Sequence, residues 1–192
     1  ISAEPATTAP MRIAVTLMPC ASTAAGFSPA TRTASPSGVR QSTQLAVSEN
    51  EDALFLERMS APSAGRNLAH VAGRLPLHTS SAGLVLLAHA PADLQERVLA
   101  GPLPAATEHS VTDRAALRRM LSEIRRTGRI VAHGFVDSEA TAIAVPVCSP
   151  RGEVIAALAV VMPRGTHPDE FVLTHLRRAS DGIRASLGET LV

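Results

Sequence analysis

The chain has 192 residues, of which 45% are apolar, so it can bury the core of one ordinary domain or two small ones. Its formal charge is +1, from 18 basic and 17 acidic side chains, and this near balance argues against DNA binding by the chain alone. The absence of Lys, Trp and Tyr excludes lysine Schiff-base chemistry and nearly excludes aromatic platforms for stacked bases.

The first part of the chain has the composition of a linker. Residues 1–43 are rich in Ala, Ser, Thr and Pro and show no sustained helical or strand periodicity. The pattern changes at Gln44, where apolar runs begin to alternate with turn signals. We therefore predict a linker-like segment over residues 1–43 and one domain over residues 44–192.

The predicted domain opens with two short strands. Gln44 to Ser48 and Ala53 to Arg58 are apolar runs on either side of a polar break that suits a hairpin. Asn67 to Ala72 is a candidate for a third strand. These runs predict that the domain begins with β-structure.

Helical patterns occupy the middle of the domain. Ser80 to His89 is apolar nearly all round, which predicts a buried helix, and Pro91 begins a second short helix that ends near Leu99. A longer helix follows, for which Thr112 is the predicted cap and Gly128 lies just past the end. Its apolar stripe indicates a helix that packs on one side only.

The last third of the domain is predicted to be a hairpin with a covering helix. Arg129 to Ala132, Ala140 to Cys148 and Glu153 to Met162 are predicted strands, and Thr166 to Gly188 is a predicted helix. Strands therefore come first, helices next, and a hairpin and a helix last. This order predicts an α+β fold in which helices pack on the faces of an antiparallel sheet.

Few residues are available for metal or disulfide chemistry. Cys20 and Cys148 are too few for a disulfide framework or a four-cysteine zinc site, and the 7 histidines show no metal-ligand spacing. No apolar run approaches the roughly 20 residues of a membrane helix. We therefore expect a cytoplasmic protein with no metal, no cofactor and no membrane contact.

One segment carries a distinctive family motif. Gly73 to Gly83, which reads GRLPLHTSSAG, resembles the signature of the IclR family of bacterial transcriptional regulators. IRRTG at Ile124 to Gly128, AIAVPV at Ala142 to Val147 and GEVIAALAV at Gly152 to Val160 follow in the family's order and spacing. The resemblance implies the family's C-terminal effector-binding domain, whose fold is similar to GAF and PAS sensor domains and which forms homodimers and often homotetramers.

The resemblance also has an implication for DNA. Regulators of this family carry an N-terminal winged helix-turn-helix, and nothing in residues 1–43 resembles one. We therefore expect contact with DNA only through a winged helix-turn-helix domain that is absent from this chain. Binding of a small-molecule effector would then control the DNA affinity of the full regulator.

The family's effector site can be carried over by motif position. In the family, the effector lies at one face of the sheet, held by backbone amides after the Leu-Pro-Leu-His run and by side chains of the last strands. The matching candidates here are Ser80, Ser81, Ala82, Ala132, Ala142, Ala159 and Val161. Members that bind short 2-oxo acids carry polar residues at such strand positions, whereas all four here are apolar. We therefore expect an effector with an apolar or aromatic body and one carboxylate.

Two other functions remain open at this stage. The first is an enzyme on a similar fold, such as a hydrolase that uses Ser81 or Cys148 as nucleophile. It requires a general base beside the nucleophile, and the predicted effector positions contain none. The second is a free-standing dimerisation module that modulates a full regulator. The preferred interpretation is a ligand sensor without catalytic residues.

Overall fold

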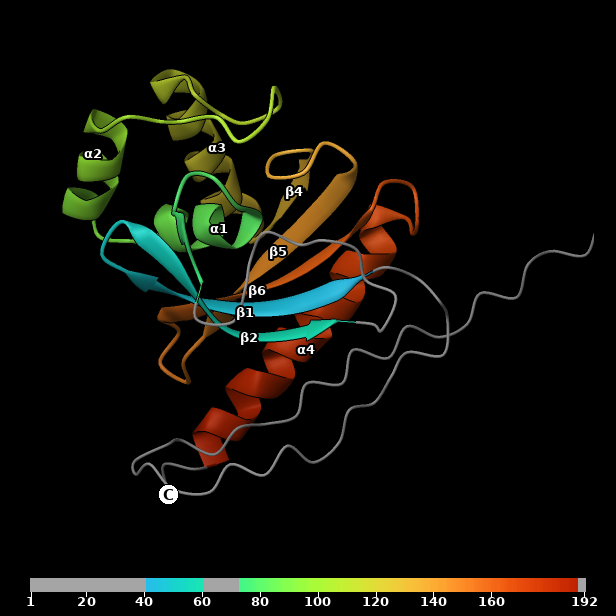
Figure 1. Cartoon of the computed structure of the whole chain (residues 1–192). Helices are drawn as coiled ribbons and strands as arrows, with labels where there is room; N and C mark the ends of the chain where they lie inside the picture. The colour runs from blue at the N-terminus through green and yellow to red at the C-terminus, as the bar shows by residue number, and fades with distance from the viewer. Residues whose placement is uncertain (1–40, 61–72, 190–192) are drawn as a thin grey trace, which may run out of the picture.

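The computed structural model describes residues 41–60 and 73–189. Its strands form one six-stranded antiparallel sheet in the order β3-β2-β1-β6-β5-β4 (Figure 1). The elements are β1 (Ser42–Glu49), β2 (Asp52–Ser60), β3 (Arg74–Pro76), α1 (Ser81–His89), α2 (Ala92–Ala100), α3 (Arg114–Thr127), β4 (Ile130–His133), β5 (Ala140–Cys148), β6 (Val154–Pro163) and α4 (Asp169–Glu189). The predicted α+β fold, an antiparallel sheet with helices on its faces, is confirmed.

Helices cover the two faces of the sheet unequally. α1 lies across β1, β4, β5 and β6, and α3 packs on the outer side of α1 (Figure 1). α4 runs along the opposite face, where its contacts are with β5 and β6. Two apolar cores result, one on the α1 side of the sheet and one on the α4 side.

Strands β5 and β6 present small side chains to one core and large ones to the other. Successive residues of a strand point to opposite faces, so each strand contributes to both cores. The α1 side receives Ala144, Ala157 and Ala159, with Ala142 packed against them. The α4 side receives Ile143, Val145, Val147, Leu158, Val160 and Met162. A small-residue surface therefore faces α1.

The first hairpin forms where the sequence predicts it. Asn50 adopts a left-handed backbone conformation with φ of 56° between β1 and β2, a conformation that asparagine tolerates better than most residues. The register shifts opposite Leu45 and Ala46, where Leu56 is the extra residue of a bulge in β2. The candidate strand over Asn67 to Ala72 lies outside the described residues, and the third strand found is β3.

Two predicted helix starts need correction. α3 is capped by Asp113 and not by Thr112, because the Asp113 carboxylate accepts a hydrogen bond of 2.7 Å from the amide of Ala116. A carboxylate at this position also interacts favourably with the positive end of the helix dipole. α4 begins at Asp169, later than the predicted Thr166, because the amide and hydroxyl of Thr166 both bond to the Pro163 carbonyl in a turn.

Candidate functional site

The N-terminus of α1 brings together the first three predicted effector residues. Ser80 caps the helix, and its hydroxyl accepts a hydrogen bond of 3.1 Å from the Gly83 amide. Its carbonyl accepts a bond of 2.8 Å from Leu84. Within the described residues, the amides of Ser81 and Ala82 have no acceptor, as expected for the first turn of a helix. Such amides are suited to an anionic group.

Close packing fixes the position of this helix start. The Thr79 amide bonds to the Pro76 carbonyl in a turn, and His78 Nε2 lies 3.3 Å from the Pro104 carbonyl oxygen. A Cβ atom on Gly83 would overlap the carbonyl group of Leu77. Only glycine therefore permits the approach of α1 to the preceding loop at this position.

The four predicted strand residues lie on the α1 side of the sheet. Ala132 pairs with Ala142, and Ala142 pairs with Val161, so these three form one row across β4, β5 and β6. Ala159 lies one pleat away on β6, on the same face as Val161. Ala82, Ala132 and Ala159 belong to one buried cluster. The structure therefore places the helix residues and the strand residues around the same core.

Polar residues extend these rows onto β1 and β2, and the sequence analysis did not identify them. Gln44 pairs with Ala159 on one side and with Arg58 on the other, and Ser42 pairs with Val161. Ser42 and Gln44 are buried. Their position follows from the alternation in β1, in which Leu45 and Val47 face the other core. Ser42 was also assigned to the linker-like segment, although β1 begins there.

Gln44 and Thr79 each have a buried polar atom without a hydrogen-bond partner. The two atoms are Nε2 of Gln44 on β1 and Oγ1 of Thr79, directly before the cap residue of α1. Their side chains are exposed by only 4% and 8%. Buried polar groups without partners are uncommon because each costs free energy, so both atoms require an explanation.

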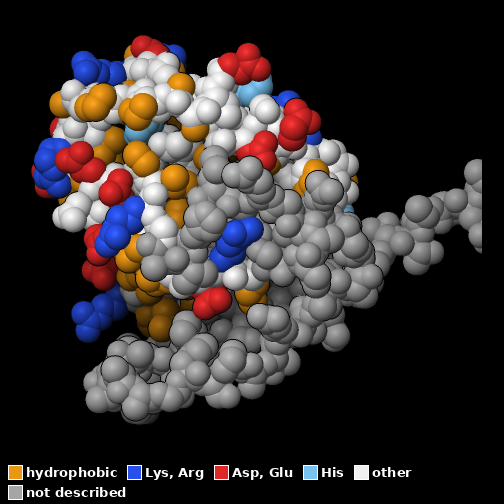
Figure 2. Space-filling model, in the orientation of Figure 1, with side chains coloured by type: hydrophobic (Ala, Val, Ile, Leu, Met, Phe, Trp, Pro, Cys, Tyr) orange, Lys and Arg blue, Asp and Glu red, His pale blue; other side chains and the backbone are white. Residues whose placement is uncertain are grey.

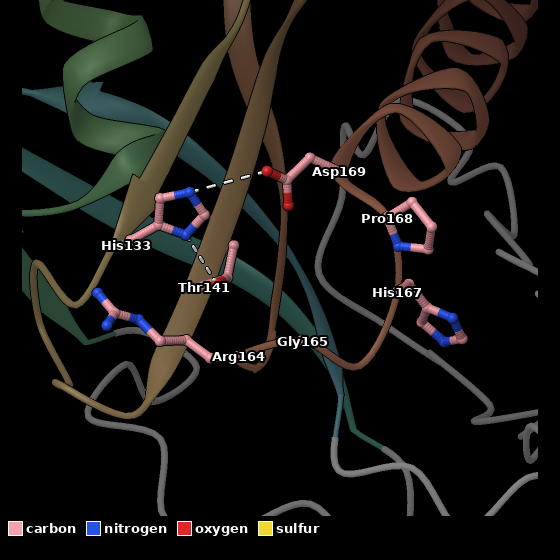
Figure 3. A pocket seen from close by; sticks show the side chains of 7 residues that line it. All are labelled: His133, Thr141, Arg164, Gly165, His167, Pro168 and Asp169. Atoms are coloured by element: carbon pink, nitrogen blue, oxygen red, sulfur yellow. Dashed lines mark hydrogen bonds and ion pairs between the residues drawn. The ribbon is translucent and has the colours of Figure 1, made fainter.

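A separate hollow of about 520 Å³ opens where β4, β5 and β6 meet the start of α4 (Figure 3). His133 Nδ1 lies 3.0 Å from Oγ1 of Thr141, and His133 Nε2 lies 3.7 Å from Oδ2 of Asp169. Arg164 and His167 also line the hollow, and His167 lies beyond Pro168 from His133 (Figure 3). None of the predicted effector residues lines this hollow.

In the hollow, the Thr141 hydroxyl, the His133 imidazole and the Asp169 carboxylate follow one another in space. Many hydrolases arrange a hydroxyl, an imidazole and a carboxylate in this order. Here Thr141 is only 2% exposed, so its hydroxyl is shielded from a substrate. The nucleophiles considered from the sequence lie elsewhere: Ser81 is buried at α1, and Cys148 lies at the opposite end of β5 from Thr141. No cluster of three metal-ligating side chains occurs in residues 41–60 and 73–189.

Two arginines on the surface of α3 are paired with acidic groups. Arg118 lies 2.7 Å from Glu96, and Arg126 lies 2.6 Å from Glu123. The Arg126 hydrogen bond lowers the pKa of Glu123, and the same bond raises the pKa of Arg126. Figure 2 shows basic and acidic side chains interspersed on the visible face of the molecule. This part of the surface is a solvated face with mixed charge.

No helix in the described part of the chain has the length and hydropathy required to cross a membrane.

Comparison with known proteins identifies the domain type. Residues 29–183 match the family profile described as bacterial transcriptional regulator IclR, C-terminal. A solved IclR homologue from Microbacterium hydrocarbonoxydans, complexed with 4-hydroxybenzoate, is 49% identical, with a TM-score of 0.74 over 79% of this chain and 62% of that chain. The six-stranded sheet with its helices is thus the GAF-like fold of IclR C-terminal domains, as the motifs predicted.

More distant relatives agree with this assignment. The Pca operon regulatory protein of Acinetobacter baylyi is 32% identical over 108 residues, which are 56% of this chain and 39% of the relative. A double mutant of the inducer-binding domain of PobR from Acinetobacter, in complex with 3-hydroxybenzoic acid, shares the fold at 24% identity, with a TM-score of 0.66 over 74% of this chain and 87% of that domain. The chain spans about half the length of the curated relatives that it matches.

Proposed function

The chain belongs to the IclR family of bacterial transcriptional regulators, and on that basis we propose that its described domain binds a small aromatic carboxylate as effector. Members of this family are regulators of transcription and not enzymes. One observation carries the proposal: unpaired amides at the N-terminus of α1 and a row of small apolar residues lie around the same core. The relative that is 49% identical and complexed with 4-hydroxybenzoate supports it.

The two parts of the site would bind the two parts of the effector. The amides of Ser81 and Ala82, with the neighbouring Ser80 hydroxyl, would hold the carboxylate at the positive end of α1. The aromatic ring would lie against the strand residues Ala132, Ala142, Ala159 and Val161. Burial of apolar area contributes roughly 25 cal/mol per Å², so a ring gains more from these residues than a short 2-oxo acid does.

In the full regulator, the effector would act at a distance. We propose that binding shifts the equilibrium between two states of a homodimer or homotetramer, and that a winged helix-turn-helix domain transmits the shift to DNA. Such a regulator would act in the cytoplasm, where the operator is. The IclR membership of the chain and its mixed-charge surface are consistent with this role.

Titration calorimetry with benzoate, 4-hydroxybenzoate, pyruvate and glyoxylate tests the proposal. We expect the two aromatic acids to bind and the two short acids to bind much more weakly, since the strand residues offer a 2-oxo group no hydrogen bond. Tighter binding of pyruvate than of either aromatic acid would overturn the proposal.

A pair of variants locates the site. Ala159→Leu places a large side chain in the α1-side core, and we expect aromatic acids to lose at least about tenfold in affinity because the added atoms occupy their space. Ala115→Leu makes the same change on the exposed surface of α3 and is expected to bind like the wild type. Equal binding by both variants would place the effector elsewhere.

A further inference from the structure

The buried carboxamide of Gln44 leaves its nitrogen without a hydrogen-bond partner in the domain. Its side chain is 4% exposed, and Nε2, which carries two N–H donors, has no hydrogen-bond partner. An apolar side chain of similar size at this position would avoid the cost of the unpaired donor. A residue that weakens the fold in this way is explained if a bound molecule supplies the missing acceptor.

The sheet register places this donor beside the proposed aromatic site. Gln44 on β1 pairs directly with Ala159 on β6, and Ala159 is followed across the sheet by Ala144 on β5. All three side chains point to the α1 side, and α1 itself packs on β1 as well as on β5 and β6. The carboxamide therefore borders the small-residue surface on the side away from β4 and β5.

A second unpaired atom lies at the helix end of the same core. Thr79 Oγ1 is buried and has no partner, and the residue directly precedes the α1 cap residue Ser80. One unsatisfied group therefore lies next to the proposed carboxylate site, and the other lies in the sheet. An effector with two polar groups, one at each end of an apolar ring, would match this arrangement.

The hydrogen-bonding groups around Gln44 indicate which polar substituent the effector ring would carry. Nε2 is a donor, and Arg58 lies directly across from Gln44 on β2, so the surroundings favour an oxygen that accepts a hydrogen bond. A phenolic hydroxyl can accept such a bond. An aromatic amine is a poor acceptor, and it would bond to Gln44 only if the carboxamide turned to present Oε1 in place of Nε2.

We propose that Gln44 determines effector specificity by donating a hydrogen bond from its buried carboxamide to a ring substituent that accepts one, such as the hydroxyl of a hydroxybenzoate. This inference rests on the proposed binding of an aromatic carboxylate. Gln44 lies outside the motif positions of the family and comes to lie beside Ala159 through the pairing of β1 with β6.

The test compares three acids that differ at one position: 4-hydroxybenzoate, benzoate and 4-aminobenzoate. Calorimetry on the wild type is expected to give 4-hydroxybenzoate the highest affinity. In Gln44→Leu and in Gln44→Met, which keeps the length of the side chain, 4-hydroxybenzoate should lose roughly tenfold and benzoate less than about twofold. The preference for the hydroxyl group then disappears, while binding of the ring and the carboxylate remains.

A matched control and a second measurement separate this effect from misfolding. Gln95→Leu removes a glutamine on α2 whose Nε2 donates to the Ala90 carbonyl at 2.8 Å, and it should leave the ratio of the three affinities unchanged. Without ligand, Gln44→Leu should unfold at the same temperature as the wild type or higher, since the unpaired donor is gone, whereas Gln95→Leu should unfold at a lower temperature.

The outcomes distinguish the two proposals. If the wild type binds the aromatic acids and both Gln44 variants keep the wild-type affinity ratio, the role of Gln44 is wrong and the proposed function stands. If the wild type binds none of the three acids, the proposed function is wrong and the role of Gln44 falls with it.

Discussion

The two cores of this domain share the same strands but are built from different side chains. On the α4 side, β5 and β6 contribute Ile, Val, Leu and Met side chains that pack against Val172, Leu173 and Leu176. On the α1 side, the same two strands contribute only alanines to the buried cluster, and buried polar residues follow on β1. Successive residues of each strand thus point in turn to the tightly packed core on the α4 side and to the small-residue surface on the α1 side.

We interpret this contrast as a division between residues that stabilise the fold and residues of the proposed effector site. Large aliphatic side chains gain the most from burial, so the α4 side is expected to supply much of the stability of the sheet. Small side chains gain less, and an unpaired donor such as Gln44 Nε2 reduces stability. The α1 side therefore has the composition expected of a functional surface, and four substitutions test the distinction.

The largest effect is expected on the α4 side. Leu176→Ala removes a fully buried side chain, and it should lower the free energy of unfolding by about 2–5 kcal/mol, because a cavity remains in the core. Denaturant titration measures this loss. The contrast predicts that binding of 4-hydroxybenzoate stays within about twofold of the wild type. Thr174→Ala, on the exposed side of the same helix, is the control and should change little.

A glycine pair tests the tight approach of α1 to its preceding loop. Gly83→Ala would force a methyl group against the Leu77 backbone, and we expect a loss of about 1–3 kcal/mol by denaturant titration, despite the better helix propensity of alanine. Gly182→Ala, on α4, has no atom within 4 Å of the new methyl group and should gain about 0.5–1 kcal/mol. Two changes of the same sign would contradict the account of Gly83.

A substitution of the α1 cap residue, Ser80, tests whether one residue contributes both to stability and to effector binding. Ser80→Ala removes the acceptor for the Gly83 amide and should cost about 1 kcal/mol in denaturant titration. It should also weaken binding of aromatic acids in calorimetry, because the first turn is less well ordered. Ser122→Ala, on the exposed side of α3, should leave both quantities unchanged. Loss of stability with unchanged affinity would place the carboxylate away from this helix end.

The smallest effect is expected outside both cores. Arg126 lowers the pKa of Glu123, so their pair stabilises the protein above the ordinary pKa of a glutamate and loses this contribution as the pH falls through the lowered value. Glu123→Gln should therefore shift Tm by no more than about 2 °C at pH 7 and by less in acid. Thermal unfolding between pH 3 and pH 7 measures this, and a larger shift in acid would contradict the assignment.

Local pattern predicted most of the elements, because each depends on residues close together in the chain. The apolar run from Ala140 to Cys148 indicated β5, and the apolar stretch from Ser80 to His89 indicated α1. The cap of α3 was misplaced because Thr112 and Asp113 are both good cap residues, and only the geometry distinguishes them.

The candidate site was predicted only in part. The motif gave the α1 residues and the four strand residues, and their role in binding stays a prediction. Gln44 and Ser42 were missed because the strand that brings them beside the candidate residues is β6, which is far away in the sequence. Pairing between distant strands depends on the tertiary fold, and no local periodicity reveals which polar residue comes to lie beside which alanine.

The strand order also has a consequence for synthesis on the ribosome. β1 is the first strand of the sheet to be made, yet one of its two neighbours is β6, which is the last. Until β6 emerges, the nascent hairpin of β1 and β2 exposes an unpaired edge that invites aggregation and chaperone binding. Pairing over such a long separation slows folding. Gln44 and Ala159 meet only in this late step, so a truncated nascent chain would lack the proposed effector site.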